Sequence, residues 1–83
     1  HYAVAIRYKE GQDMAPIVVA KGMNQIALNI KKIARENGVH VVQNPPLARS
    51  LYAEVDLEAP IPEALFQAVA EVLAYVYKMD KKR

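Results

Sequence analysis

Residues 1–8 read HYAVAIRY, and this stretch decides how the rest of the chain must be arranged. Large side chains alternate along it with alanine or arginine, which is the two-residue period of a β-strand. Both faces are largely apolar, and this favours a central strand over an edge strand. The strand begins directly after His1, with no polar lead-in, which raises the question of what precedes it and which strand lies beside it.

The length and composition indicate one small globular domain, residues 1–83. The apolar fraction of 53% and the charged fraction of 24% are typical of a folded module rather than a disordered chain. The absence of cysteine excludes disulfides and thiolate metal sites. The net charge is only +2, and we interpret the basic tail 78–83 as a solvated end rather than a nucleic-acid surface.

The first half of the chain predicts a βαβ unit. Pro16 opens a second strand, Ile17–Ala20, at a position where a missing backbone donor does little harm. An apolar stripe with helical spacing runs from Met23 to Ala34, and Asn37-Gly38 is a typical helix stop. Val39–Val42 then reads as a third short strand, so a helix would connect two parallel strands.

Two further helices are expected in the second half. Asn44 is a good cap for a helix over about residues 45–55, whose first turn holds two prolines. Pro62 can begin the last helix, over about residues 63–78. Together these elements indicate an α/β domain with a small mixed sheet, about three strands of which come from this chain, packed with three helices.

The last helix carries more apolar surface than one face of a sheet can cover. Its wide apolar stripe leaves only a narrow polar line through Glu63, Gln67, Glu71 and Lys78. The excess would either meet another helix or line an exposed apolar depression, a feature that often binds something on small proteins. Ordinary two-sided packing is an equal alternative at this point.

Groups that could perform catalysis or bind a metal are sparse. Ser50 is the single serine, threonine and cysteine are absent, and the histidines are His1 and His40. A nucleophile needs a nearby base, and two isolated histidines do not make a metal site. Asn44 could cyclise and break the chain before Pro45 in a strained turn, but capping is the favoured role. We therefore expect no turnover enzyme, no metal and no cofactor.

Four segments carry a resemblance to a known family. They are HYAVAIRY (1–8), APIVVAKG (15–22), PPLARSLY (45–52) and IPEALFQAVAEVLAYVY (61–77). In this order and spacing they resemble the cytoplasmic C-terminal domain of the FlhB-type family, membrane components of flagellar and virulence type III protein-export machines. The segments VAKG and PPLAR are more similar to sequences of the flagellar branch than to those of the injectisome branch. The alternatives are an injectisome homologue, a stand-alone FlhB-like domain and, remotely, an unrelated basic module that binds nucleic acid.

The resemblance implies a role in switching export from rod- and hook-type subunits to filament-type subunits. Family members cleave themselves between the Asn and the Pro of an Asn-Pro-Thr-His motif, and His1 matches the His of that motif. The reactive Asn would then precede this chain, and the upstream fragment would stay bound and add a strand beside Tyr2–Tyr8. The implied location is the cytoplasmic face of the bacterial inner membrane, at the export gate.

The resemblance also implies partners and a binding site. The partners are the N-terminal fragment, an export-gate protein, a hook-length ruler protein and rod- or hook-type export subunits, with no nucleic acid. A small hydrophobic depression that recognises early substrates matches Ala15, Pro16, Ala70 and Leu73. Ala70 and Leu73 are three residues apart, which makes them neighbours on one face of the last helix.

Overall fold

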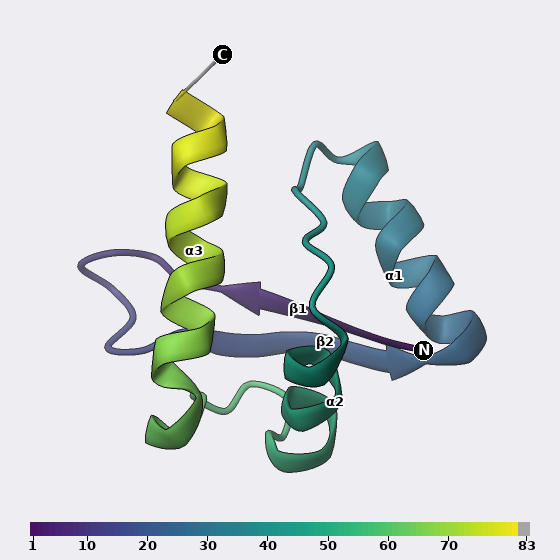
Figure 1. Ribbon diagram of the computed structural model, residues 1–83, viewed down its shortest axis with the longest axis horizontal. Helices are drawn as coiled ribbons and strands as arrows, with labels where there is room; N and C mark the ends of the chain where they lie inside the picture. Colours follow the sequence, from purple (N-terminus) through teal and green to yellow (C-terminus); the bar gives the residue numbers. More distant parts are fainter. Residues whose placement is uncertain (82–83) are drawn as a thin grey trace.

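The computed structural model describes residues 1–81, so the end of the 78–83 tail lies outside the described residues. Two strands cross the middle of the molecule, with helices packed against them (Figure 1). The elements in chain order are β1 (Tyr2–Arg7), β2 (Ile17–Met23), α1 (Asn24–Glu36), α2 (Pro45–Glu54), the short 3-10 helix η1 (Glu63–Leu65) and α3 (Phe66–Lys81).

The sheet is an antiparallel hairpin of β1 and β2. Its register pairs Tyr2 with Met23 and Arg7 with Ile17, with an irregularity between Ala5 and Ile6. The second strand is longer than predicted, because it continues past Ala20 to Met23.

Residues 58–61 run along the free edge at the start of β2. Ile17 forms an antiparallel bridge with Pro60. The Val18 amide donates to the carbonyl oxygen of Ala59 at 3.2 Å, and the Ile61 amide donates to that of Pro16 at 3.1 Å. Backbone groups at the edge of the sheet nearest Pro16 are therefore hydrogen-bonded to residues 58–61 of the same chain.

The predicted third strand at Val39–Val42, and with it the βαβ unit, is wrong for the described residues. The sheet there is a two-stranded antiparallel hairpin, and residues 39–44 follow α1 as irregular backbone. Valine-rich segments favour extended backbone, but a strand also needs a neighbour for its hydrogen bonds. Within residues 1–81 no strand pairs with this segment, and none pairs with the second edge of β1. The outside strand beside β1 stays a prediction.

The capping residues predicted from the sequence mark the start of α2 and the end of α1. The Asn44 side chain accepts a hydrogen bond from the Leu47 amide at 3.3 Å, and a proline occupies the first turn of α2, as predicted. Asn37 caps the end of α1, and Gly38 follows with a φ of 71° that suits glycine. The last helix differs from the prediction at its start, where η1 precedes α3, and at its end, which extends to Lys81. Among the helices of residues 1–81, none has the length and apolar character needed to cross a bilayer.

The hydrophobic core joins β2, α2, the 58–61 segment and α3. Its buried members are Val18, Leu47, Leu51, Val55, Ile61 and Val69. Val4 and Ile6 of β1 pack against this cluster, so the large-residue face of the strand points to the core. By contrast, α1 is poorly covered: Ala27 is fully buried, while Ile26 and Ile33 are 60% and 59% exposed. The apolar stripe predicted for this helix exists but faces solvent for much of its width.

Two adjacent residues of β2 fix how the helices meet the strand. The Lys21 ammonium group donates to the carbonyl oxygens of Tyr52 and Val55, at 3.1 and 2.7 Å, and lies 5.4 Å from the centre of the Tyr52 ring. Gly22 is buried, and a Cβ added to it would lie 2.9 Å from the Cβ of Ile26. Lysine therefore fastens α2 to the strand, and glycine lets the first turn of α1 approach it closely.

Candidate functional site

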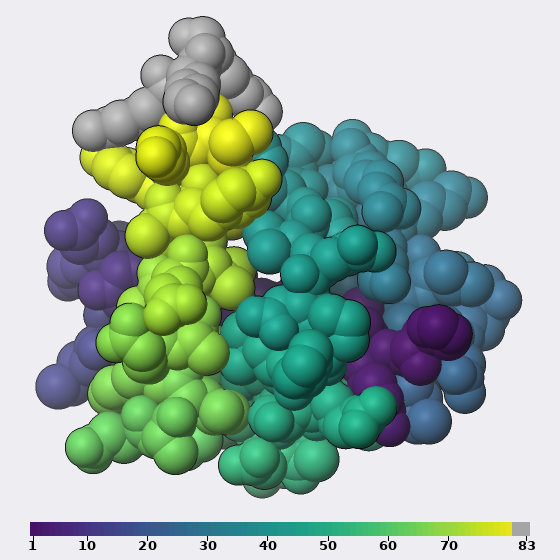
Figure 2. Space-filling view, in the orientation of Figure 1, coloured from purple at the N-terminus to yellow at the C-terminus, as the bar shows by residue number. Residues whose placement is uncertain are grey.

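An open apolar groove lies between α3 and the loop that joins β1 to β2, where Figure 2 shows the purple loop beside the green-to-yellow helix. Its volume is about 790 Å³. The residues that line it are Tyr8, Glu10, Met14, Ala15, Pro16, Ile61, Phe66, Ala70, Leu73, Ala74, Val76, Tyr77 and Asp80. All four residues predicted for the substrate depression are among them. The structure thus brings Ala15 and Pro16 together with Ala70 and Leu73, from segments more than fifty residues apart in the sequence.

One wall of the groove is a single face of α3. Phe66, Ala70, Leu73 and Tyr77 follow one another at spacings of four, three and four residues, so they lie along one side of the helix. At a rise of about 1.5 Å per residue, this face extends for about 16 Å. Ala70 and the neighbouring Ala74 have short side chains and leave room at the middle of this face, while the aromatic rings of Phe66 and Tyr77 lie at its two ends.

The opposite wall is the loop, which Asp13 holds in shape. Its carboxylate accepts a hydrogen bond from the Lys9 amide at 2.8 Å and pairs with the Arg7 guanidinium at 3.3 Å. The hydrogen bond from Lys9 and the one from Arg7 lower the pKa of Asp13 below its ordinary value. Gly11, with a φ of 86°, forms the turn inside this closed loop. The arrangement fixes the backbone immediately before Met14, Ala15 and Pro16.

Large apolar side chains stand exposed around the groove. Met14 is fully exposed, Tyr77 is 63% exposed, and Tyr8 and Phe66 are each 44% exposed. Contiguous apolar surface of this kind marks interaction sites on small proteins, and aromatic residues and methionine are enriched at such interfaces. Sequence reasoning missed Tyr8, Glu10 and Met14, although the position of Met14 beside Ala15-Pro16 was a usable signal.

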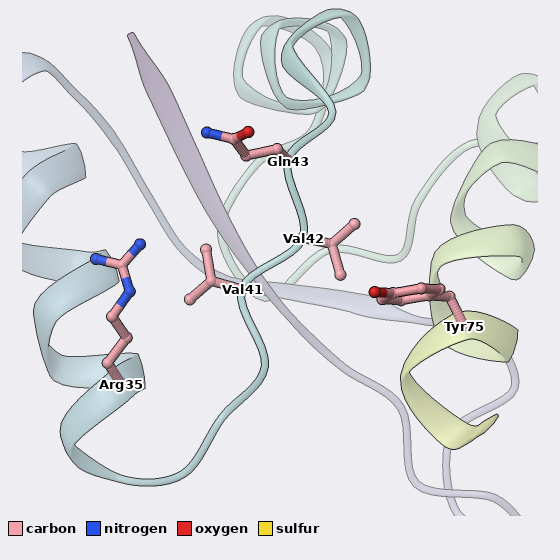
Figure 3. Close-up of a pocket in the computed structure, with 5 residues that line it drawn as sticks. All are labelled: Arg35, Val41, Val42, Gln43 and Tyr75. Atoms are coloured by element: carbon pink, nitrogen blue, oxygen red, sulfur yellow. The ribbon is translucent and has the colours of Figure 1, made fainter. Parts of the chain in front are cut away.

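A second hollow lies on another side of α3. It has a volume of about 520 Å³ and is lined by Arg35, Val41, Val42, Gln43 and Tyr75. Figure 3 shows the Tyr75 ring directed toward Val42, with Arg35 approaching from α1 on the far side of the 41–43 segment. None of the predicted site residues lines this hollow.

The histidines and the serine considered in the sequence analysis lie outside the groove lining. His40 Nε2 lies 2.7 Å from Asp80 Oδ1, so this histidine is hydrogen-bonded to a carboxylate of α3. The carbonyl oxygen of His1 accepts a hydrogen bond from the Asn24 amide at 2.8 Å. Ser50 is half-buried within α2.

Comparisons with known proteins agree with the resemblance over the whole chain. The flagellar biosynthetic protein FlhB of Bacillus subtilis is 50% identical over 82 residues, which cover 99% of this chain and 23% of that protein. The hypersensitivity response secretion protein HrcU of Ralstonia nicotianae is 53% identical over 79 residues, 95% of this chain and 22% of that protein. The chain therefore spans about a quarter of the length of these curated relatives.

A solved structure shares the fold. The cytoplasmic domain of FlhB from Shewanella putrefaciens matches with a TM-score of 0.93 and 45% identity, over 99% of this chain and 67% of that one. The family described as "FlhB HrpN YscU SpaS Family" matches residues 1–76. The resemblance stated from the four sequence segments is thereby confirmed, and this chain belongs to the FlhB HrpN YscU SpaS family.

Proposed function

We propose that this chain is the C-terminal cytoplasmic part of a flagellar type III export protein, and that its groove binds rod- and hook-type subunits. The supporting observation is the convergence of Ala15, Pro16, Ala70 and Leu73 on one open apolar groove. Family membership supports the class of machine, since relatives along the whole chain carry the name flagellar biosynthetic protein FlhB.

The physical character of the groove suits a transient export step. A wall about 16 Å long, with two alanines at its centre, offers a ligand little area to bury. Interfaces of small area are typical of weak, short-lived complexes. A subunit on its way to secretion must be released again, so modest affinity is an advantage here.

The proposal includes a change of specificity from hook-type to filament-type subunits after self-cleavage upstream of His1. The upstream fragment would remain bound and extend the sheet, and it would pair with the edge of β1 that has no neighbour among residues 1–81. A hook-length ruler and an export-gate protein would act on the domain at the cytoplasmic face of the inner membrane. The reaction would occur once, at an Asn outside residues 1–83, so we do not assign turnover catalysis to this chain.

The test replaces Ala70 with Asp in the full-length protein. A carboxylate on the groove floor would lose water without gaining a partner when an apolar segment docks. We expect hook-type subunits to bind at least about tenfold more weakly, a loss of about 1.4 kcal/mol or more. The measurement is a titration with a purified hook-type subunit, together with secretion of the same subunit in cells.

The matched control is Ala64→Asp, which places the same charge in η1, outside the groove lining. We expect this variant to bind like the wild type. Equal affinity of the Ala70→Asp protein and the wild type would refute the groove as the binding site.

The second candidate is an injectisome homologue, favoured by the 53% identity to HrcU. Expression of the full-length gene in a strain that lacks its flagellar export protein separates the two. Restored motility supports the flagellar assignment, whereas restored effector secretion in an injectisome mutant alone supports the second candidate.

A further inference from the structure

Among the described residues, the charged side chains that line the apolar groove are all acidic. They are Glu10, from the β1–β2 loop, and Asp80, near the end of α3. Among the described residues that line the groove, none is lysine, arginine or histidine. The chain as a whole carries a net charge of +2, whereas these two lining residues are both negative.

The two carboxylates are available to a ligand to different degrees. Glu10 is exposed, and its side chain has no ion-pair or hydrogen-bond partner among the described residues. Asp80 is 55% exposed at its side chain, and its Oδ1 atom lies 2.7 Å from His40 Nε2. That contact holds Asp80 in place and leaves Oδ2 without a described partner.

We propose that the groove selects apolar segments that carry lysine or arginine beside the apolar anchor, and that Glu10 and Asp80 read this charge. The inference rests on the proposed function, because it takes the groove as the subunit-binding site. Apolar contact with Ala70, Leu73 and the exposed rim would supply affinity, and the carboxylates would supply discrimination. Complementary rim charges act in this way at other interfaces, where they steer encounter and disfavour partners of like charge.

The sign of the preference is informative because it opposes the overall charge. A chain of net positive charge attracts acidic partners at long range. A preference for a basic flank would therefore have to come from short-range contact with Glu10 and Asp80. Both carboxylates are exposed, so each is expected to contribute about a two- to fivefold change in affinity, and salt is expected to reduce it.

The experiment uses two synthetic peptides of about sixteen residues that share one leucine- and alanine-rich sequence. One has a lysine at each flank of the leucine cluster, and its twin has glutamate at the same positions. Each is titrated into the full-length protein by fluorescence anisotropy, at about 0.05 M and about 0.5 M salt. We expect the lysine peptide to bind more tightly by about fivefold or more at low salt, and the difference to shrink at high salt.

Variants assign the effect to the groove. Glu10→Gln and Asp80→Asn should each reduce the difference between the peptides, while Glu36→Gln, at the end of α1, should leave it unchanged. Leu73→Ala should weaken both peptides to a similar extent, because it removes apolar contact and leaves the charge of the groove unchanged.

Three results would overturn the inference: equal binding of the twins, a lysine preference that survives in the Glu10→Gln, Asp80→Asn double variant, or no binding of either peptide. The titration with the hook-type subunit is separate. If that subunit binds through Ala70 but the twins do not differ, the charge preference fails and the proposed function stands.

Discussion

Replacing Lys21 with Met tests how the domain is held together. The methionine keeps most of the apolar stem but removes the ammonium group, and with it the hydrogen bonds to Tyr52 in the last turn of α2 and to Val55, which follows the helix. Those bonds reach the carbonyl oxygens of Tyr52 and Val55, which have no further helical turn to satisfy them. The change should therefore separate the end of α2 from β2 without opening a cavity.

The expected cost follows from the contacts. A hydrogen bond to a charged group contributes about 1.5–3 kcal/mol, and a cation–π contact at a partly exposed site about 0.5–1 kcal/mol. The freed carbonyl oxygens can reach water in part, and the contributions share one ammonium group, so they do not add in full. We expect Lys21→Met to lower the free energy of unfolding by about 2–3 kcal/mol, a large part of the stability of a small domain.

The assay is urea unfolding, followed by circular dichroism, of a protein that contains this chain and the segment preceding it in its relatives. Lys32→Met is the matched control, because Lys32 is exposed on α1 and should change stability by less than about 0.5 kcal/mol. A Tyr52→Leu background separates the contributions, since it removes the ring but keeps the backbone oxygens. If Lys21→Met costs no more than Lys32→Met, the fastening role of Lys21 is refuted.

Three further predictions concern the sheet and its loop. Gly22→Ala should lower stability by about 1–3 kcal/mol, because the new methyl group meets Ile26; a urea midpoint equal to that of the wild type would contradict this. Asp13 has a lowered pKa when folded, so its ionised contacts with Lys9 and Arg7 stabilise the fold above its unfolded pKa of about 3.8, and this contribution is lost as pH falls through the folded pKa. Unfolding of wild type and Asp13→Asn should accordingly differ at pH 7 and converge in acid, and a constant difference would count against it. Amide hydrogens of β1 should exchange more slowly when the preceding segment is present; equal rates would argue against an added strand.

Local features of the fold could be predicted from the sequence because their causes are local. Asn44 and the prolines after it specify the start of α2 through one side-chain hydrogen bond and one fixed backbone angle. Gly38 ends α1 because a residue with positive φ is needed there. The excess of apolar residues on α3 left two-sided packing and an exposed apolar depression as equal alternatives, and the structure shows Phe66 and Tyr77 partly exposed at the groove.

Pairing between distant segments could not be predicted in the same way. Val39–Val42 has the composition of a strand, but composition does not say which backbone lies beside it. The edge of β2 is instead bridged by residues 58–61, which contain Pro60 and have no strand-like alternation. The prediction of the third strand is wrong because hydrogen-bond partners, rather than side-chain pattern, decide whether an extended segment joins a sheet.

Only part of the groove could be predicted from the sequence. Spacing alone placed Ala70 and Leu73 on one helix face, while their proximity to Ala15 and Pro16 came only from the family resemblance. The loop wall depends on Asp13 folding back to the Lys9 amide and to Arg7, and no periodicity reveals such a closure. Glu10 lines the groove because it belongs to this closed loop.

Hydrogen exchange of the full-length protein with and without a purified hook-type subunit shows whether the subunit binds at the groove. We expect slower exchange on binding at the amides of Met14 and Ala15 and in residues 70–77, with little change in residues 39–43 beside the second hollow. Protection confined to residues 39–43 or to α1, with the groove unaffected, would contradict this expectation.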